Sequence, residues 1–242
     1  DDKANVHTGW LVSLAHLAPG IVRKLNEYYK EKKVREVLVM GHSQGGGIAF
    51  LLRSYLEYAR QQQLIPGDLF FKTYCSAGPK PGNMYYAYDY DFITRGGWGF
   101  NVVNSADWVP EVPFSIQTLA NFNPTNVFVN TKKMLKKQKF FVRLIGNHVY
   151  NKMEKKPRKA QRRYEKYLGH KIYKIAIKKA LPGLKEPDYV HDNNYMRAGT
   201  PVILLTNPAY YTLFPENPDK PFTHHMFQAY FYLLKQHYGG ER

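Results

Sequence analysis

Gly41-His42-Ser43-Gln44-Gly45 lies between an apolar run, Val37-Leu38-Val39-Met40, and a stretch of helical spacing that begins at Ile48. The first run is short and continuously apolar, which predicts a buried strand. The second repeats its apolar side chains every three to four positions, which predicts an amphipathic helix. A Gly-x-Ser-x-Gly turn between a strand and a helix is typical of a nucleophile elbow, where small residues let the serine hydroxyl project above the sheet. The alternative is a glycine-rich loop with an ordinary serine.

The composition is that of a globular chain. With 242 residues it is long enough to bury one core, and its hydrophobic content of 44% and aromatic content of 15% argue against disorder. No apolar run reaches the length of a membrane span, so any membrane contact is expected to be peripheral. Cys75 is the only cysteine, which excludes an intrachain disulfide.

The net charge of +16 is concentrated in one segment. Residues 131–185 contain nineteen Lys and Arg against two acids, a balance of +17. The rest of the chain therefore holds 16 bases and 17 acids, or −1. We expect a near-neutral core over 1–118 and 190–242 that carries a basic, helical insert over 119–189.

Strands and helices alternate along the chain outside this insert. The pattern predicts a helix over 11–30 that is interrupted at Pro19-Gly20, and a closing helix over 223–238. It also predicts strands over 69–75, 100–104 and 201–205. This alternation is typical of an α/β fold with a mostly parallel sheet and helices on both faces.

A serine hydroxyl needs an imidazole to accept its proton and a carboxylate to orient that imidazole. In hydrolases with this elbow, the acid follows the serine and the histidine comes last. Asp107 follows the predicted strand over 100–104, which is the position expected of the acid. Its alternative role is a turn-forming aspartate that hydrogen-bonds its own backbone. The remaining acids considered follow no convincing strand: Asp89, Asp91, Asp188 and Asp192.

The histidine has two candidates by position. His224 and His225 both precede the predicted closing helix, after the last strand. His148 and His191 fall inside or beside the basic insert. His42 is adjacent to the serine, and we expect its side chain to point away from the reacting face. A histidine near a helix start is often a capping or surface residue, which is the alternative for both candidates.

Five blocks of sequence besides the elbow, which extends to Gly46, form a recognisable series. They are Val6-His7-Thr8-Gly9-Trp10, Thr73 to Asn83, Val102 to Pro110, Tyr195 to Val202, and His225-Met226-Phe227-Gln228-Ala229-Tyr230. Together they resemble the class 3 lipases, the fungal-lipase-like branch of the α/β-hydrolase fold. The resemblance covers about 1–118 and 190–242, but not the basic insert.

This resemblance implies a triad of Ser43 as nucleophile, Asp107 as orienting acid and His225, favoured over His224, as general base. It implies that the backbone amide of Gln44 is one oxyanion-hole donor. No cofactor and no metal are implied. A secreted, periplasmic or surface-attached protein is favoured.

The chain departs from the family near its start. The second oxyanion donor normally comes from an Arg-Gly-Ser/Thr-like loop upstream of the Val-His-x-Gly block, where only about five residues precede it here. A single strand is predicted before the elbow, where the fold expects several. We therefore expect that N-terminal strands are missing or are supplied by another segment. Thr8 or Gly9 is the substitute donor that the sequence offers.

The basic insert interleaves lysines and arginines with apolar residues at helical spacing. Such a stretch over 131–185 is typical of peripheral contact with an anionic membrane surface. The alternative is a cap or lid whose apolar face closes over an acyl pocket and whose charges are solvated. Nucleic-acid binding is a remoter reading, because no motif of a nucleic-acid module supports it.

The function expected from the sequence is hydrolysis of lipid acyl esters through an acyl-serine intermediate, as in a lipase or esterase, including the phospholipase A type. The alternative is a catalytically idle protein that binds lipids or polyanions on a hydrolase scaffold. The substrate partner is a lipid or another acyl ester in the first case.

Overall fold

The computed structural model describes residues 2–239 and divides into two compact units. Unit 1 comprises Asp1–Pro113 and Tyr195–Arg242, and unit 2 comprises Phe114–Asn194. Unit 1 holds the α/β core with the elbow, and unit 2 is mainly helical. Each unit is described by itself below.

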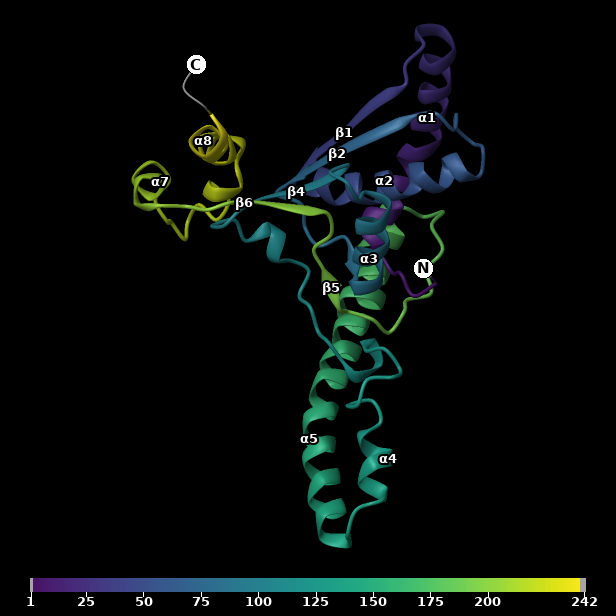
Figure 1. The fold of residues 1–242 in the computed structure, drawn as a ribbon, viewed down its shortest axis with the longest axis vertical. Helices are drawn as coiled ribbons and strands as arrows, with labels where there is room; N and C mark the ends of the chain where they lie inside the picture. Colours follow the sequence, from purple (N-terminus) through teal and green to yellow (C-terminus); the bar gives the residue numbers. More distant parts are fainter. Residues whose placement is uncertain (1, 240–242) are drawn as a thin grey trace. The chain divides into compact units, whose positions relative to one another are not determined.

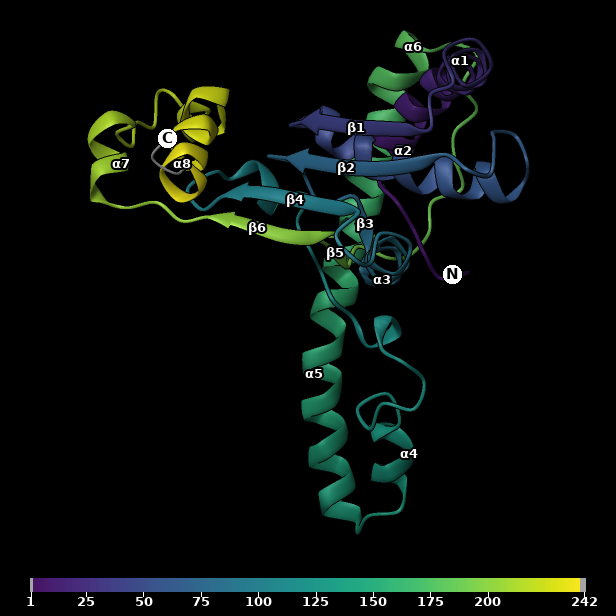
Figure 2. The same ribbon diagram turned by 45° about the horizontal axis from the view of Figure 1, so that its top comes forward.

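Unit 1 is built on a four-stranded, fully parallel sheet (Figure 2). Its strands lie in the order β1 (Glu36–His42), β2 (Phe70–Ser76), β4 (Gly99–Asn104) and β6 (Thr200–Leu204). Because all four strands run the same way, their carboxyl ends lie along one edge of the sheet, where ligands bind in open α/β folds. The elbow follows β1 at this edge and Asp107 follows β4.

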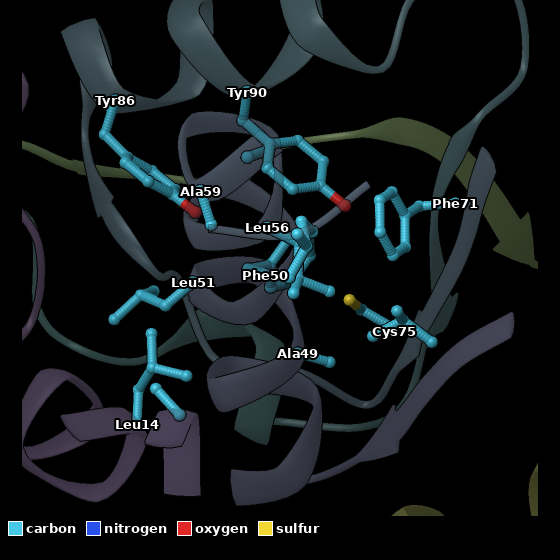
Figure 3. Packing of buried hydrophobic residues seen from close by; sticks show 14 of the residues in the cluster. Leu14, Ala49, Phe50, Leu51, Leu56, Ala59, Phe71, Cys75, Tyr86 and Tyr90 are labelled. Carbon is cyan, nitrogen blue, oxygen red and sulfur yellow. The ribbon is translucent and has the colours of Figure 1, made fainter. Parts of the chain in front are cut away.

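Three helices and the sheet enclose the larger core cluster on one face. They are α1 (Thr8–Lys32), α2 (Gln44–Gln61) and α3 (Met84–Ile93). Figure 3 shows Phe50 and Leu56 of α2 lying between Cys75 of β2 and the tyrosines of α3. These side chains are buried, and their removal from water is the main force that holds α2 against the sheet.

The other face is covered over β4 and β6 by the C-terminal helices. A second core cluster joins Val102 and Leu204 of the sheet to Tyr210 of α7 (Pro208–Leu213) and Leu233 of α8 (Phe227–Tyr238). The sheet therefore has helices on both faces, as the sequence predicted. This confirms the expected α/β class of the fold, with a mostly parallel sheet.

Part of this second face is open. Leu38 and Met40 of β1 are 57% and 68% exposed, and Phe70 of β2 is 54% exposed. Among residues 2–239, no strand pairs with the outer edge of β1. Parallel sheets normally have both faces covered, so this corner of the sheet is unusual in exposing apolar side chains.

A short antiparallel pair completes the strands of unit 1. It joins β3 (Gly82–Asn83) to β5 (Tyr195–Met196), and Val6 forms a single bridge to Gly82. Asn83 also accepts hydrogen bonds from the amides of Asn5 and Tyr86, so the segment before α1 is tied to the start of α3.

Unit 2 contains a helical hairpin, visible in Figure 1 as α4 and α5. Its elements are η2 (Leu119–Asn121), α4 (Thr131–Lys136), α5 (Phe140–Tyr164), the π-helical segments η3 (Glu165–Lys171) and η4 (Tyr173–Ile177), and α6 (Lys178–Ala180). Leu135 of α4 fits against Gly146 of α5, where a Cβ atom would lie 2.5 Å from the leucine Cδ2. The two helices can therefore approach closely at this point.

The predicted break in the first helix is wrong, because α1 runs without interruption through Pro19. A proline inside a helix removes one hydrogen bond and costs about 3 kcal/mol. Leu14 and Ala18 are buried before the proline, and Ile21 and Leu25 pack against the same core after it. Burial of both halves on α2 offsets the lost bond, which the sequence around Pro19 alone could not show.

The closing helix, in contrast, is broken where the sequence predicted continuity. The segment consists of a short 3-10 turn, η5 (Thr223–His225), and then α8, with Met226 extended at φ −72° and ψ 153° between them. Within residues 2–239, no helix has both the length and the apolar content needed to cross a bilayer.

Candidate active site

Ser43 occupies a sharp turn between the end of β1 and the start of α2. Its backbone has φ 60° and ψ −129°, a left-handed region that residues with a Cβ rarely adopt. Two hydrogen bonds hold this conformation: the Ser43 amide donates to the carbonyl oxygen of Ser76 at 3.0 Å, and the Gly47 amide donates to the Ser43 carbonyl at 3.1 Å. The strained backbone of Ser43 is thus held in place by one hydrogen bond to β2 and one from α2.

The two motif glycines have different physical roles. A Cβ on Gly41 would lie 2.1 Å from the carbonyl oxygen of Gly45, so the turn can close only without a side chain there. A Cβ on Gly45 would meet no atom within 4 Å. Gly47 is also required, because the indole of Trp10 fills the space where its side chain would be.

The structure brings together the three residues that the sequence singled out. His225 Nε2 lies 2.8 Å from Ser43 Oγ, and His225 Nδ1 lies 2.8 Å from Asp107 Oδ2. Since the carboxylate is an acceptor, Nδ1 carries the proton that it donates to Asp107. Nε2 is then free to accept the proton of the serine hydroxyl, which is the arrangement that a general base requires.

Asp107 is buried and accepts from three donors. Its Oδ2 accepts from His225 and from the hydroxyl of Tyr230 at 2.8 Å, and its Oδ1 accepts from the amide of Val109 at 3.0 Å. The Asp107 amide in turn donates to the carbonyl of Asn104 at 3.0 Å. A buried carboxylate needs such partners, because an unpaired charge would be costly away from water.

The other acids considered lie elsewhere. Asp89 accepts from Tyr58 at 2.6 Å, and Asp91 accepts from the amide of Gly199 at 2.6 Å, both in unit 1. Asp188 and Asp192 belong to unit 2. Asp89 and Asp91 thus have hydrogen-bond partners other than His225.

The structure also separates the histidine candidates. His224 Nδ1 is 2.8 Å from the hydroxyl of Tyr210, so its ring turns away from the serine while that of His225 faces it. His191 is bonded to Glu165 within unit 2, and His148 is exposed in the same unit. The adjacent pair His224–His225 therefore divides between two hydrogen-bond networks.

The expectation that His42 points away from the site is wrong. Its Nε2 donates to the carbonyl oxygen of His225 at 2.9 Å, and its Nδ1 lies 2.8 Å from Ser76 Oγ. Because the carbonyl can only accept, Nε2 carries the proton and Nδ1 accepts from the serine hydroxyl. The ring also lies 4.2 Å, between centroids, from that of Phe227. Burial lowers the pKa of His42 and so favours this neutral ring.

Asn104 is a second residue that the sequence analysis missed. Its Nδ2 donates to the carbonyl of His224 at 2.8 Å and to the hydroxyl of Tyr210 at 2.9 Å. Its Oδ1 accepts from the amide of Ala106 in the loop that carries Asp107. Asn104 thus fixes both the acid loop and the histidine segment, and its place at the end of the predicted strand, three positions before Asp107, was the available signal.

The candidate oxyanion donor Gln44 is the first residue of α2. The first amides of a helix have no acceptor within that helix and point along its positive end, where negative charge is stabilised. Thr8 and Gly9 lie in the first turn of α1, which contacts the first turn of α2 through Trp10 and Gly47. Their role as a second donor stays a prediction.

His7 directly precedes α1 beside these residues, and its side chain makes no capping hydrogen bond. Its ring lies edge-on to that of Trp10, with 3.3 Å between the centroids. Burial lowers the pKa of His7 to about 4, so this imidazole is neutral near pH 7. Within residues 2–239, no group of three or more His, Cys, Asp or Glu side chains is arranged to hold a metal ion.

Comparison with known proteins finds a family similar to part of the chain. The family described as Lipase (class 3) matches residues 1–117. These residues are therefore similar to class 3 lipases. The secreted mono- and diacylglycerol lipase MDL4 of Malassezia globosa is 34% identical to this lipase-like chain over 118 residues, which are 47% of the chain and 35% of the relative.

A lipase of Rhizopus niveus is 33% identical over 111 residues, or 46% of this lipase-like chain and 27% of the relative. The solved structure of lipase II from Rhizopus niveus aligns with a TM-score of 0.40 and 31% identity, over 47% of this chain and 41% of that one. The class 3 lipase-like chain thus spans about a third, or less, of the length of the curated relatives it matches.

Proposed function

We propose that this protein hydrolyses carboxylic esters of lipids, with Ser43 as nucleophile, His225 as general base and then acid, and Asp107 as orienting carboxylate. The observation that carries the proposal is the continuous line of hydrogen bonds from Ser43 Oγ through the His225 ring to Asp107. The match of residues 1–117 to class 3 lipases supports the same chemistry.

The proposed reaction has two halves. In the first, His225 Nε2 takes the serine proton as Ser43 Oγ attacks the ester carbonyl, and the imidazolium then protonates the departing alcohol. In the second, His225 takes a proton from water as it attacks the acyl-serine, and then gives that proton to Ser43 Oγ as the ester bond breaks and the carboxylic acid leaves. Asp107 stabilises the imidazolium in both halves and keeps Nδ1 protonated.

The tetrahedral intermediates carry a negative oxygen that needs preorganised donors. We assign the amide of Gln44 to this role, since it opens α2 directly after the nucleophile. Loss of one such donor typically lowers the rate by about 10²- to 10³-fold. Thr8 and Gly9 are the proposed sources of the second donor.

The proposed substrates are lipid acyl esters, including those of the phospholipase A type. The secreted lipases of Malassezia globosa among the relatives support export of this protein as well. We further propose peripheral contact of the basic insert, residues 131–185, with an anionic membrane surface, on the strength of its charge of +17. Action of residues 119–189 as a cap or lid stays a prediction.

The direct test is labelling with a fluorophosphonate probe together with hydrolysis of a chromogenic acyl ester. We expect the probe to label wild-type protein and Ser115→Ala, a matched change at an exposed serine, but not Ser43→Ala. Hydrolysis that survives Ser43→Ala would refute the mechanism. A wild-type protein that is folded but neither labels nor hydrolyses would favour the catalytically idle lipid- or polyanion-binding alternative.

A further inference from the structure

The closed end of the α4–α5 hairpin in unit 2 exposes an unusual concentration of apolar side chains. Five of the first six residues of α5 are apolar, and each of the five is between 52% and 74% exposed. They are Phe140, Phe141, Val142, Leu144 and Ile145. Each residue advances the direction of its side chain by about 100° around a helix, so these five cover roughly 200° of the circumference at this end of α5 and Arg143 lies on the remaining side. An apolar face of that width is normally buried.

The hairpin holds these side chains outward. Leu135 of α4 packs where Gly146 of α5 has no side chain, so the contact between the two helices lies at the residue that directly follows the exposed ones. The rings of Phe140 and Phe141 contact only edge to face, with 5.5 Å between their centroids. The end of the hairpin therefore presents its aromatic rings to the surroundings and does not close over them.

Positive charge surrounds the same apolar residues. Lys132, Lys133, Lys136, Lys137, Lys139 and Arg143 give six charges within residues 131–145. No Asp or Glu occurs between Glu111 and Glu154. Arg143 lies 5.8 Å from the centre of the Phe140 ring, so cation and aromatic surface are presented together.

An apolar end ringed by lysines matches one partner in both respects. An anionic lipid bilayer offers acyl chains for the phenylalanines and phosphate groups for the lysines within the same few ångströms of depth. A nucleic acid offers phosphates for the lysines, but it has no apolar interior in which the five exposed aliphatic and aromatic side chains could be buried. A second protein chain would need a dense acidic rim.

We infer that residues 131–145 form a membrane-insertion tip, which enters the headgroup region of anionic phospholipid membranes with Phe140 and Phe141 foremost. This deepens the proposed function, on which the choice of a lipid partner rests, by naming the element that delivers the enzyme to its substrate surface. Each lysine near the surface strengthens binding about fivefold. Each buried phenylalanine strengthens it about tenfold or more.

The test measures partition onto vesicles in the Ser43→Ala background, so that its outcome does not depend on hydrolysis. Vesicles of phosphatidylcholine alone are compared with vesicles containing about one third phosphatidylglycerol. We expect binding to be at least tenfold stronger on the anionic vesicles and to weaken as salt rises from about 0.05 M to about 0.5 M.

Two sets of variants separate the apolar and charged contributions. Phe140→Ser with Phe141→Ser should lower binding at least tenfold. Lys136→Gln with Lys137→Gln and Lys139→Gln should lower it about a hundredfold. The matched controls, Leu17→Ser with Phe92→Ser and Lys30→Gln with Lys32→Gln and Lys33→Gln, alter exposed residues of unit 1 and should leave binding within about twofold of the parent. Equal thermal unfolding midpoints exclude misfolding of the variants.

Insertion itself is read from a Phe141→Trp variant. Lipids brominated near the headgroup should quench its added fluorescence, beyond the background of the three native tryptophans. Three outcomes would overturn the inference: no binding to anionic vesicles, binding unaffected by the phenylalanine substitutions, or a dimer that these substitutions dissolve. Salt-sensitive binding to heparin or RNA that ignores Phe140 and Phe141, without vesicle binding, would point to a polyanion instead. A failure of probe labelling at Ser43 would be a separate result and would concern only the catalytic proposal.

Discussion

The ring of His42 donates a hydrogen bond to the backbone carbonyl of His225, with 2.9 Å between Nε2 and the oxygen. His42, which precedes the proposed nucleophile Ser43, thus positions the backbone of the proposed base, His225. Its other ring nitrogen is anchored to Ser76 at the end of β2, so the position of the base depends on two neighbouring strands.

We expect His42→Phe to lower kcat by about 10- to 100-fold, because the ring volume remains while both hydrogen bonds are lost and His225 is less well aligned. KM for a small soluble ester should change less than kcat. His42→Gln keeps a hydrogen-bond donor for the carbonyl of His225 and should restore part of kcat. The control is His16→Phe, at an exposed position of α1. An unchanged rate of fluorophosphonate labelling in His42→Phe would contradict a positioning role.

The two glycines of the elbow give opposite predictions for the same substitution. Gly41→Ala should destabilise the protein by about 1–3 kcal/mol or more and suppress activity, since its Cβ would collide with the carbonyl of Gly45. Gly45→Ala should retain the fold and stabilise it by up to about 1 kcal/mol, since the space is open and alanine favours a helix. Urea unfolding of the two variants is the measurement, and equal effects would refute this geometry of the turn.

Removing the charge at Asp107 should matter far more than removing one of its donors. Asp107→Asn is expected to lower kcat by about 10⁴-fold, because the imidazolium loses its counter-charge and the tautomer of His225 changes. Tyr230→Phe deletes one of three hydrogen bonds to the carboxylate and should cost about tenfold or less in kcat and about 1 kcal/mol in stability. Steady-state kinetics rank the two, and a larger loss for Tyr230→Phe would argue against Asp107 as the orienting acid.

His7 predicts a loss of stability in mild acid. Its pKa is lowered by burial to about 4 in the folded protein, whereas an unfolded chain titrates near the ordinary value of 6.5. The unfolded state therefore binds the proton first, so the stability from the neutral ring is fully present above pH 6.5 and is lost as pH falls toward 4. The loss at pH 4 should be about 3 kcal/mol.

This effect is measured as the free energy of unfolding in urea between pH 4 and pH 7. His7→Gln should flatten the decline over this range, whereas His16→Gln, an exposed change on the same helix, should leave it as in the wild type. A decline of the same size in His7→Gln would assign the acid sensitivity to other groups.

The strands along the chain and two of the three principal site residues, Ser43 and Asp107, followed from local patterns. Ser43 comes directly after a strand and Asp107 comes three positions after the end of another. Parallel strands bring their carboxyl ends to one edge whatever lies between them in the chain. The sequence could therefore propose neighbours 64 positions apart without knowing the packing. The choice of His225 over His224, however, came from resemblance, since both follow the last strand.

What the sequence could not show depends on partners that are distant in the chain. The hydrogen bond between His42 and His225 joins residues that are 183 positions apart in the chain. The bond from Asn104 to the carbonyl of His224 joins residues that are 120 positions apart. Similarly, α1 continues through Pro19 because both of its halves pack against α2. Local propensity carries no information about such contacts, so these features became visible only in the folded chain.

The open corner of the sheet at β1 has a practical consequence. The outer edge of β1 presents backbone amides and carbonyls with which another extended polypeptide can pair as an additional strand. The exposed apolar side chains of Leu38 and Met40 lie beside this edge. The protein is thus prone to self-association through the exposed edge of β1 at high concentration. The solubility and the oligomeric state should be measured as a function of protein concentration before any kinetic constant is assigned to the monomer.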